Sequence, residues 1–195
     1  GLDYRLTPEF PFPAPIDDSV AAYRWLLSHG VNPKKIVIGG DSAGGGLMVA
    51  VLVALKYLGE PMPAAGVGIS SWTDMEATGQ SFVTNAEVDP SVNRDRILTI
   101  AKLYMADKDH SAPLASPIHA DLTGLPPLLL QVGSIETLLD DTNVLAQRAK
   151  AAGVEVEVDV WDDMPHVWHH FAPILPEARQ AIERIGQFIK KHTGL

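Results

Sequence analysis

A serine set among glycines is the part of this sequence best suited to chemistry. The pattern Gly-x-Ser-x-Gly is met by Gly40, Ser42 and Gly44, between a β-branched segment and an apolar run that starts at Leu47. Where a strand turns into a helix, this pattern forms a strained turn that holds the serine hydroxyl clear of the backbone. Ser42 is therefore a candidate nucleophile, and the N–H of Ala43 is a candidate oxyanion donor. A glycine-rich turn without chemistry is the plain alternative.

A nucleophilic serine needs a base, and the base needs an acid that orients it. The candidate base is His166, on a loop after the alternating segment 154–160. The candidate acid is Glu136, just after the apolar run 127–132. Ser42, Glu136 and His166 thus each follow an expected strand. Because parallel strands end on one edge of a sheet, residues so far apart in sequence can meet there.

Two further carboxylates compete with Glu136 for the role of the acid. Asp140 and Asp141 stand at the beginning of an expected helix that ends near Gly153. Acidic residues are favoured there because they cap free N–H groups and complement the helix dipole. We therefore expect Asp140 and Asp141 to form the cap and the first turn, and Glu136 to be the acid.

A histidine cluster after the last strand suggests a different chemistry. The spacing of His166, His169 and His170 would place two of them on one face of a helix, as metal ligands require. Pro165 and Trp168, however, are typical of packing around a loop, and no cysteine supplies a second kind of ligand. We expect no metal site in this cluster.

Alternation of strands and helices predicts the architecture. Strands are expected at 65–69, 128–132 and 154–160, in addition to the one that leads into Ser42. The last of them alternates valine with acidic residues, so one face is apolar and the other acidic. This order predicts an α/β fold with a mostly parallel sheet and helices on both faces.

The first and the last helix have recognisable ends. Asp17 and Asp18 are expected to cap the first helix, and Pro176 opens the last one. The residues expected to pack inward from the last helix are Ile182, Ile185, Phe188 and Ile189.

Residues 72–117 are the least regular part of the chain. They hold many turn residues, a helix expected at 93–105 and the polar run 107–110. Glu87 and Asp89 are expected to be solvated. Any single residue of this segment could belong to an irregular surface segment as well as to a binding site. The sequence therefore assigns no binding residue here.

Composition excludes several classes of partner. The 195 residues carry a formal net charge of −9, and none is cysteine. An acidic chain disfavours nucleic acid and anionic membranes, because phosphate groups require a basic surface. The longest apolar run, 47–55, is too short to cross a bilayer, so no stable membrane insertion is expected. A chain without cysteine favours a reducing compartment, and a cytoplasmic location is the expectation.

Short segments along essentially all 195 residues match a known family pattern. These segments are Tyr4–Glu9, Phe12–Ala14, Asp17-Asp18, Gly40–Gly45, Ser116-Pro117, Leu122–Pro127, the segment around Glu136, and Met164–His166. Together they resemble the hormone-sensitive-lipase family of α/β-hydrolases, which includes many bacterial family IV esterases.

The resemblance implies an α/β-hydrolase fold with Ser42, Glu136 and His166 as catalytic triad. Glu136 stands where most members carry aspartate. The implied activity is hydrolysis of short-chain acyl esters through an acyl-enzyme, without a cofactor. The family's His-Gly-Gly segment, whose N–H groups form most of the oxyanion hole, does not occur in this sequence. We therefore expect residues 1–195 to be the C-terminal part of a single catalytic domain, without the N-terminal cap and first strands, and 72–117 to lie near the substrate pocket.

Other functions on the same fold stay open. Hydrolysis of an amide, formamide or carbamate uses the same triad, and the sequence does not separate it from ester hydrolysis. A non-catalytic receptor for small molecules typically lacks a triad member, whereas all three candidates are present here. Family members often pair through the last strand, which predicts a homodimer through 154–160 and the last helix. Glu155, Glu157 and Asp159 would equally protect the strand edge of a monomer.

Overall fold

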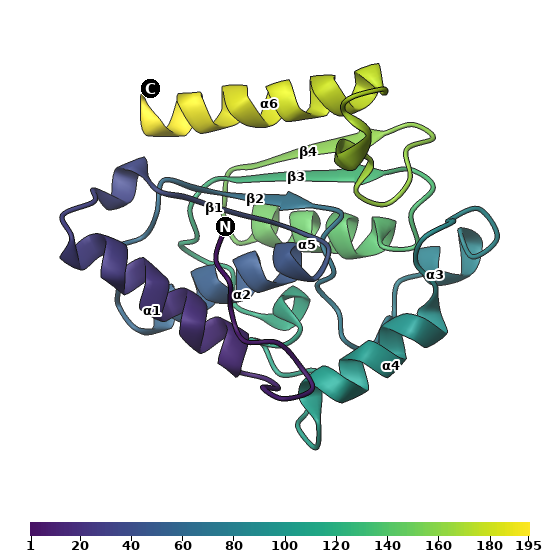
Figure 1. The fold of residues 1–195 in the computed structure, drawn as a ribbon, viewed down its shortest axis with the longest axis horizontal. Coiled ribbons are helices and arrows are strands. Elements are labelled where there is room, and N and C mark those ends of the chain that lie inside the picture. Colours follow the sequence, from purple (N-terminus) through teal and green to yellow (C-terminus); the bar gives the residue numbers. More distant parts are fainter.

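Four parallel strands form the centre of the molecule in the computed structural model, which describes all 195 residues (Figure 1). The strands are β1 (Val37–Asp41), β2 (Ala65–Ile69), β3 (Leu128–Gly133) and β4 (Val156–Trp161). They lie in the sheet in the order in which they occur in the chain, so β4 has only β3 as a neighbour. Because all pairs are parallel, the carboxyl ends of the four strands share one edge.

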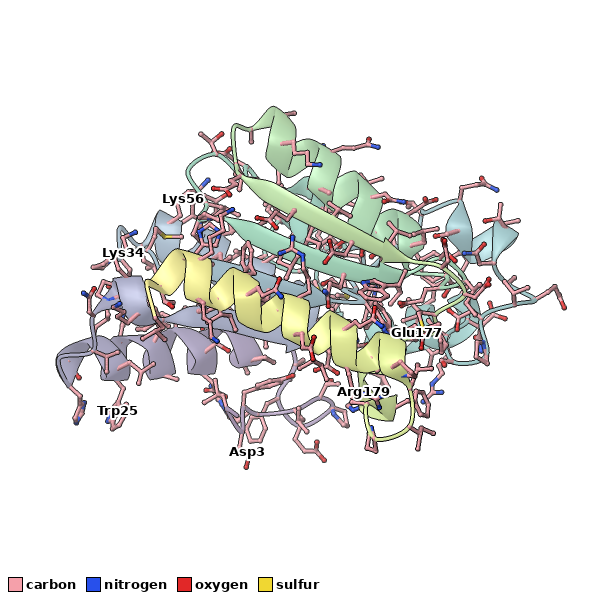
Figure 2. The ribbon with its side chains drawn as sticks, turned by 90° about the horizontal axis from the view of Figure 1, so that it is seen from above. Asp3, Trp25, Lys34, Lys56, Glu177 and Arg179 are labelled. Atoms are coloured by element: carbon pink, nitrogen blue, oxygen red, sulfur yellow. The ribbon has the colours of Figure 1, made fainter.

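Helices cover both faces of this sheet (Figure 1). The helices on one side are α1 (Ala14–Ser28), α2 (Ala43–Tyr57) and α5 (Leu139–Ala151). The opposite side is covered by α6 (Pro176–Thr193), which runs across the sheet when the molecule is seen from above (Figure 2). The predicted α/β architecture, a parallel sheet between helical layers, is confirmed. None of the helices is both long and apolar enough to cross a lipid bilayer.

Successive residues of β3 pack into different helical layers. Leu128 and Leu130 belong to a cluster with Met48 and Leu52 of α2, whereas Leu129 packs with Phe188 of α6. All three leucines are fully buried. This burial on both faces explains why the strand is apolar throughout, without the alternation of a half-exposed strand.

Two details of the helices differ from the sequence-based expectation. Helix α1 begins at Ala14 after Pro13, and the side chain of Asp18 accepts hydrogen bonds from Arg5 instead of capping the helix. In α6, Ile182 is 45% exposed, whereas Ala181 is fully buried. Successive residues of a helix point about 100° apart, so only one of these two neighbours can face the core.

Residues 72–117, called the excursion below, lie beside the edge of the sheet at which the strands end. They have a hydrophobic core of their own. The segment contains α3 (Ser81–Thr84) and α4 (Arg94–Met105), and the side chain of Asn93 caps α4 by accepting from the N–H of Arg96. The members of its buried cluster are Trp72, Met75, Ala77, Phe82, Ile97, Ala101, Met105, Ala115 and Leu138. Only Leu138 comes from outside the segment, so the excursion is a packed unit and not a loose loop.

Candidate active site

The turn between β1 and α2 holds Ser42 in a strained conformation. Ser42 has φ 54° and ψ −121°, a region that residues with a side chain rarely adopt. Its backbone N–H donates to the carbonyl of Ile69 at the end of β2, 2.9 Å away. A Cβ on Gly40 would lie 2.1 Å from the carbonyl oxygen of Gly44, and a Cβ on Gly46 1.9 Å from that of Trp72. Glycine is therefore required at these two positions by close backbone contact.

Three side chains from three strand ends form a continuous series of contacts. Nε2 of His166 lies 2.9 Å from Oγ of Ser42, and Nδ1 of His166 lies 2.8 Å from Oε2 of Glu136. An ionised carboxylate only accepts hydrogen bonds, so Nδ1 carries the ring proton and Nε2 is left to accept from the serine hydroxyl. Glu136 is fully buried, and the His166 side chain is 13% exposed. The structure thus brings together the three residues expected from the sequence.

The second oxygen of Glu136 is fixed by two donors. Oε1 accepts from the N–H of Gly133 and from Oγ of Ser70, each at 2.7 Å. A Cβ on Gly133 would lie 1.8 Å from the carbonyl oxygen of Met164, so this glycine lets the histidine loop approach the end of β3. Both oxygens of the carboxylate are therefore held by specific partners, Oε1 by Gly133 and Ser70 and Oε2 by His166.

Polar side chains of the excursion hold the backbone around Glu136. Nδ2 of Asn85 donates to the carbonyl of Glu136 at 2.8 Å, and Oδ2 of Asp89 accepts from the N–H of Thr137 at 2.7 Å. The expectation that Asp89 is solvated is wrong, because its carboxylate also accepts from the N–H groups of Ser91 and Val92. Nothing in the local sequence indicates these long-range contacts.

Asp140 and Asp141 serve a different purpose from Glu136. Both lie in the first turn of α5 as expected, but the N-cap position is Leu138, whose side chain makes no capping hydrogen bond. Oδ2 of Asp140 accepts from the N–H of Ser81, and Oδ2 of Asp141 accepts from the N–H groups of Thr73 and Asp74. They fasten the excursion to α5, and neither contacts His166. Burial raises the pKa of Asp141 to about 7.

The other two histidines of the cluster point elsewhere. Nε2 of His169 lies 2.8 Å from Oε1 of Gln131, and burial lowers the pKa of His169 to about 4. His170 is exposed. The imidazoles of His166, His169 and His170 therefore do not converge as metal ligands.

Two other groups of acids and histidine lie close together, but protein donors already occupy them. In the group of Asp74, Glu76 and His119, both oxygens of Asp74 accept backbone N–H groups. In the second group, Nζ of Lys191 binds Glu155 and Glu157. In each group, donors of the chain itself thus already bind at least one of the carboxylates.

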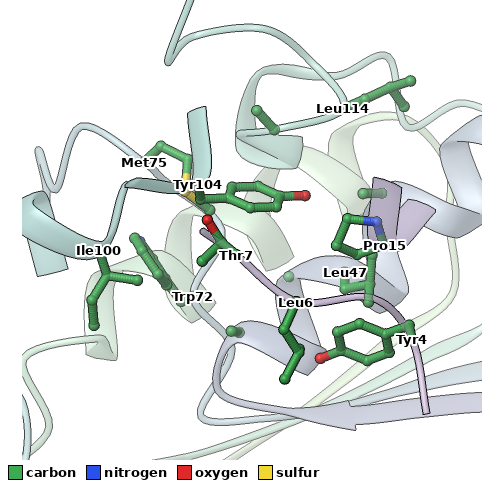
Figure 3. Close-up of a pocket in the computed structure, with 14 residues that line it drawn as sticks. Tyr4, Leu6, Thr7, Pro15, Leu47, Trp72, Met75, Ile100, Tyr104 and Leu114 are labelled. Carbon is green, nitrogen blue, oxygen red and sulfur yellow. The ribbon is translucent and has the colours of Figure 1, made fainter. Parts of the chain in front are cut away.

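An apolar cavity of about 140 Å³ borders Ala43, the residue that follows Ser42 in the chain (Figure 3). Ala43 lines it together with Leu47 of α2, and Trp72, Ile100 and Tyr104 of the excursion form the facing wall. As the first residue of α2, Ala43 has a backbone N–H without a partner inside the helix. Ala43 borders both this small apolar cavity and a larger, more open hollow of about 620 Å³ that Ser42 itself lines.

Comparison with known proteins assigns the chain to a family. Residues 1–170 match the family described as alpha/beta hydrolase fold. An acetyl-hydrolase of Streptomyces hygroscopicus is 49% identical over 194 residues, which are 100% of this chain and 65% of that protein. An esterase of Acinetobacter venetianus is 37% identical over 188 residues, which are 96% of this chain and 62% of that protein. The chain thus spans less than two thirds of the length of these relatives.

Solved structures agree with this assignment. An esterase from the bacterial hormone-sensitive lipase family has a TM-score of 0.97 and is 68% identical, covering 98% of this chain and 64% of the solved one. A hormone-sensitive lipase from a metagenome library has a TM-score of 0.96 at 44% identity, again with 98% and 64% coverage. Such likeness extends to sequence as well as to fold.

Proposed function

This chain belongs to the bacterial hormone-sensitive lipase family of α/β hydrolases, and from that premise we propose that the complete protein is a serine carboxylic ester hydrolase. The observation that carries the proposal is the series of contacts from Ser42 through His166 to Glu136, at 2.9 and 2.8 Å. Its arrangement has the geometry that a hydroxyl nucleophile, a general base and an orienting acid require.

In the proposed reaction, Oγ of Ser42 attacks the ester carbonyl while Nε2 of His166 takes the hydroxyl proton. Glu136 keeps the ring in the required orientation and stabilises the imidazolium that forms. When the tetrahedral intermediate collapses, His166 returns the proton to the departing alcohol, and the acyl group stays on Ser42. Water, activated by the same base, then hydrolyses the acyl-enzyme and releases the acid.

The negative oxygen of the tetrahedral intermediate needs donors aimed at it. The N–H of Ala43 is one such donor, at the positive end of the α2 dipole. In the family that this chain resembles, the other donors are N–H groups of a His-Gly-Gly segment, which is not among residues 1–195. We assign only the contribution of Ala43 to this chain.

Short acyl esters are the proposed substrates. The cavity beside Ala43 measures about 140 Å³, well below the roughly 300–1,000 Å³ of pockets for drug-sized ligands. Its walls are mainly apolar, including Leu47, Trp72 and Met75. A small apolar space beside Ala43, the residue that follows the proposed nucleophile, suits a short acyl chain and disfavours a long or charged one.

Replacing the nucleophile in the complete protein tests the proposal. Ser42→Ala is expected to lower hydrolysis of a short-chain aryl ester on the order of 10³-fold or more, and to abolish labelling by a fluorescent organophosphonate. The matched control is Ser71→Ala, which removes a buried hydroxyl that has no hydrogen-bond partner. A folded Ser42→Ala protein that retains a tenth of the activity would overturn the assignment. Faster turnover of the corresponding anilide than of the ester would replace esters with amides.

We further propose a homodimer through β4 and α6. Strand β4 has a free edge, and Val160 on it is 45% exposed. The acidic residues expected to protect this edge are held by α6 instead: Lys191 binds Glu155 and Glu157, and Arg184 binds Glu157 and Asp159. With their charges paired, these carboxylates oppose edge-to-edge pairing less than free ones would.

Proline substitution on the free edge tests the dimer. The carbonyl of Glu155 accepts from Leu128 of β3, and the carbonyl of Trp161 accepts from Ser134 just after β3. Backbone groups of successive strand residues point to opposite sides, so the N–H of Val158 faces away from β3. Val158→Pro removes an outward N–H and leaves the ladder to β3 intact, as proline on an edge strand can. Light scattering at micromolar concentration is expected to give a dimer for the native protein and a monomer for Val158→Pro. A native protein that is only monomeric under these conditions refutes the pairing.

A further inference from the structure

Ser70 occupies a central place at the catalytic edge although no strand-end motif singles it out. It is the first residue after β2, the strand between the one that leads to Ser42 and the one that leads to Glu136. Its N–H donates to the carbonyl of Gln131 on β3 at 2.7 Å, while the neighbouring carbonyl of Ile69 accepts from the N–H of Ser42. The end of β2 is therefore tied to both sides of the site.

The side chain of Ser70 bridges two parts of the triad. Its hydroxyl donates to Oε1 of Glu136 at 2.7 Å and accepts from the N–H of Val167 at 3.1 Å. Val167 is the residue after His166, so a single oxygen contacts the acid and the backbone that carries the base. Ser70 is fully buried, which keeps water from substituting for either contact.

The backbone of Ser70 is strained in the same sense as that of Ser42. Its φ is 48°, in the left-handed region that residues with a Cβ adopt only at a cost. Such strain persists where the surrounding contacts over-determine it. Here the contacts are those of the hydroxyl and of the N–H, which aim the side chain at Glu136.

We infer that Ser70 is a positioning residue: its hydroxyl fixes the Glu136 carboxylate and the His166 loop in the one arrangement that lets the base receive the Ser42 proton. The inference rests on the proposed ester hydrolysis and adds a residue to it. Without the hydroxyl, Oε1 of Glu136 keeps only the N–H of Gly133, and the N–H of Val167 loses its partner. Small displacements of a catalytic group are costly, because the reacting atoms must meet within narrow limits.

Two adjacent buried serines provide a matched test in the complete protein. Ser70→Ala keeps a Cβ at the strained position and removes only the hydroxyl, whereas Ser71→Ala removes a hydroxyl without partners. For Ser70→Ala we expect kcat to fall on the order of 10- to 100-fold with KM unchanged. We also expect the acidic limb of the pH–rate profile to move, and the low-field proton resonance of the His166–Glu136 hydrogen bond to shift or broaden. Ser71→Ala is expected to leave all of these unchanged.

Ser70→Gly separates positioning from stability. Glycine relieves the left-handed strain but still lacks the hydroxyl, so this variant is expected to lose activity like Ser70→Ala even if it unfolds at a higher temperature. The inference is overturned if either folded Ser70 variant matches Ser71→Ala in kcat and in pH profile. Failure of the proposed function looks different, because Ser42→Ala would then itself remain active.

Discussion

The two halves of the candidate site are built in different ways. The turn at Ser42 is shaped by missing side chains: Gly40 and Gly46 leave no room for a Cβ against nearby backbone oxygens. The turn at Glu136 is shaped by side chains that are present, from Ser70 directly after β2 and from Asn85 in residues 72–117. Close packing dominates around the proposed nucleophile, and side-chain hydrogen bonds dominate around the proposed acid. A side chain added at Gly40 or Gly46 would clash with backbone, whereas removing one hydrogen-bond partner of Glu136 leaves the other partners in place.

Replacing Glu136, the proposed acid, is expected to have the largest effect on activity. Glu136→Gln keeps the shape but offers an N–H₂ group where His166 needs an acceptor, so kcat should fall on the order of 10³- to 10⁴-fold, as in other triads. Asp140→Asn, whose carboxylate binds the N–H of Ser81 instead, should cost less than tenfold. The two variants are compared by steady-state kinetics, after circular dichroism has shown that both are folded like the native protein. A larger loss for Asp140→Asn would move the orienting role to Asp140.

In the turn that holds Ser42, replacing two different glycines with alanine should change the free energy of unfolding in opposite directions. Gly46→Ala places a Cβ 1.9 Å from the carbonyl oxygen of Trp72, and we expect it to lower the free energy of unfolding by about 4 kcal/mol or more. Gly44→Ala meets nothing within 4 Å and should raise it by up to about 1 kcal/mol, because glycine is a poor helix former. Urea unfolding measures both. Equal destabilisation by the two would show that packing does not shape this turn.

Near Glu136, the excursion is bound to α5 by the side chain of Asp141, whose protonation state depends on pH. The pKa of Asp141 is raised by burial to about 7, above the value of about 3.9 in an unfolded chain. Its contribution to stability is therefore full below about pH 4 and is lost as the pH rises towards 7. Asp141→Asn keeps an acceptor for the N–H groups of Thr73 and Asp74 but cannot ionise. The difference in unfolding free energy, variant minus native, should grow by up to a few kcal/mol from pH 4 to pH 7. Parallel pH profiles would contradict this.

The smallest effect is expected from single partners of the acid turn. Asp89→Ala removes the acceptor of the Thr137 N–H and should lower the free energy of unfolding by about 1–2 kcal/mol, with a loss of activity of only a few fold. Glu87 is exposed, and Glu87→Ala should change stability by less than about 0.5 kcal/mol. Thermal unfolding and ester turnover compare the pair. Indistinguishable variants would mean that Asp89 does not hold the turn.

The sequence was informative wherever the structure depends on neighbouring residues. The spacing of glycines around Ser42 indicates the strained turn, and the runs of apolar residues locate β2, β3 and β4 to within two residues. Local patterns of this kind also placed Glu136 and His166 directly after strands. Asp18 and Ile182 were misjudged because a cap and a helix face depend on what lies opposite them, which the pattern alone does not contain.

What the sequence by itself determined is the parallel α/β fold and the position of Ser42, Glu136 and His166 at its strand ends, because both follow from periodicity and from short turns. Only the tertiary structure decided which oxygen faces which donor. Ser70 and Asn85 reach Glu136 across 66 and 51 residues of chain, and Asp89 reaches Thr137 across 48. A hydrogen bond over such a separation is fixed by strand order and by the packing of the excursion. Neither can be read from the sequence around the residues that form the bond.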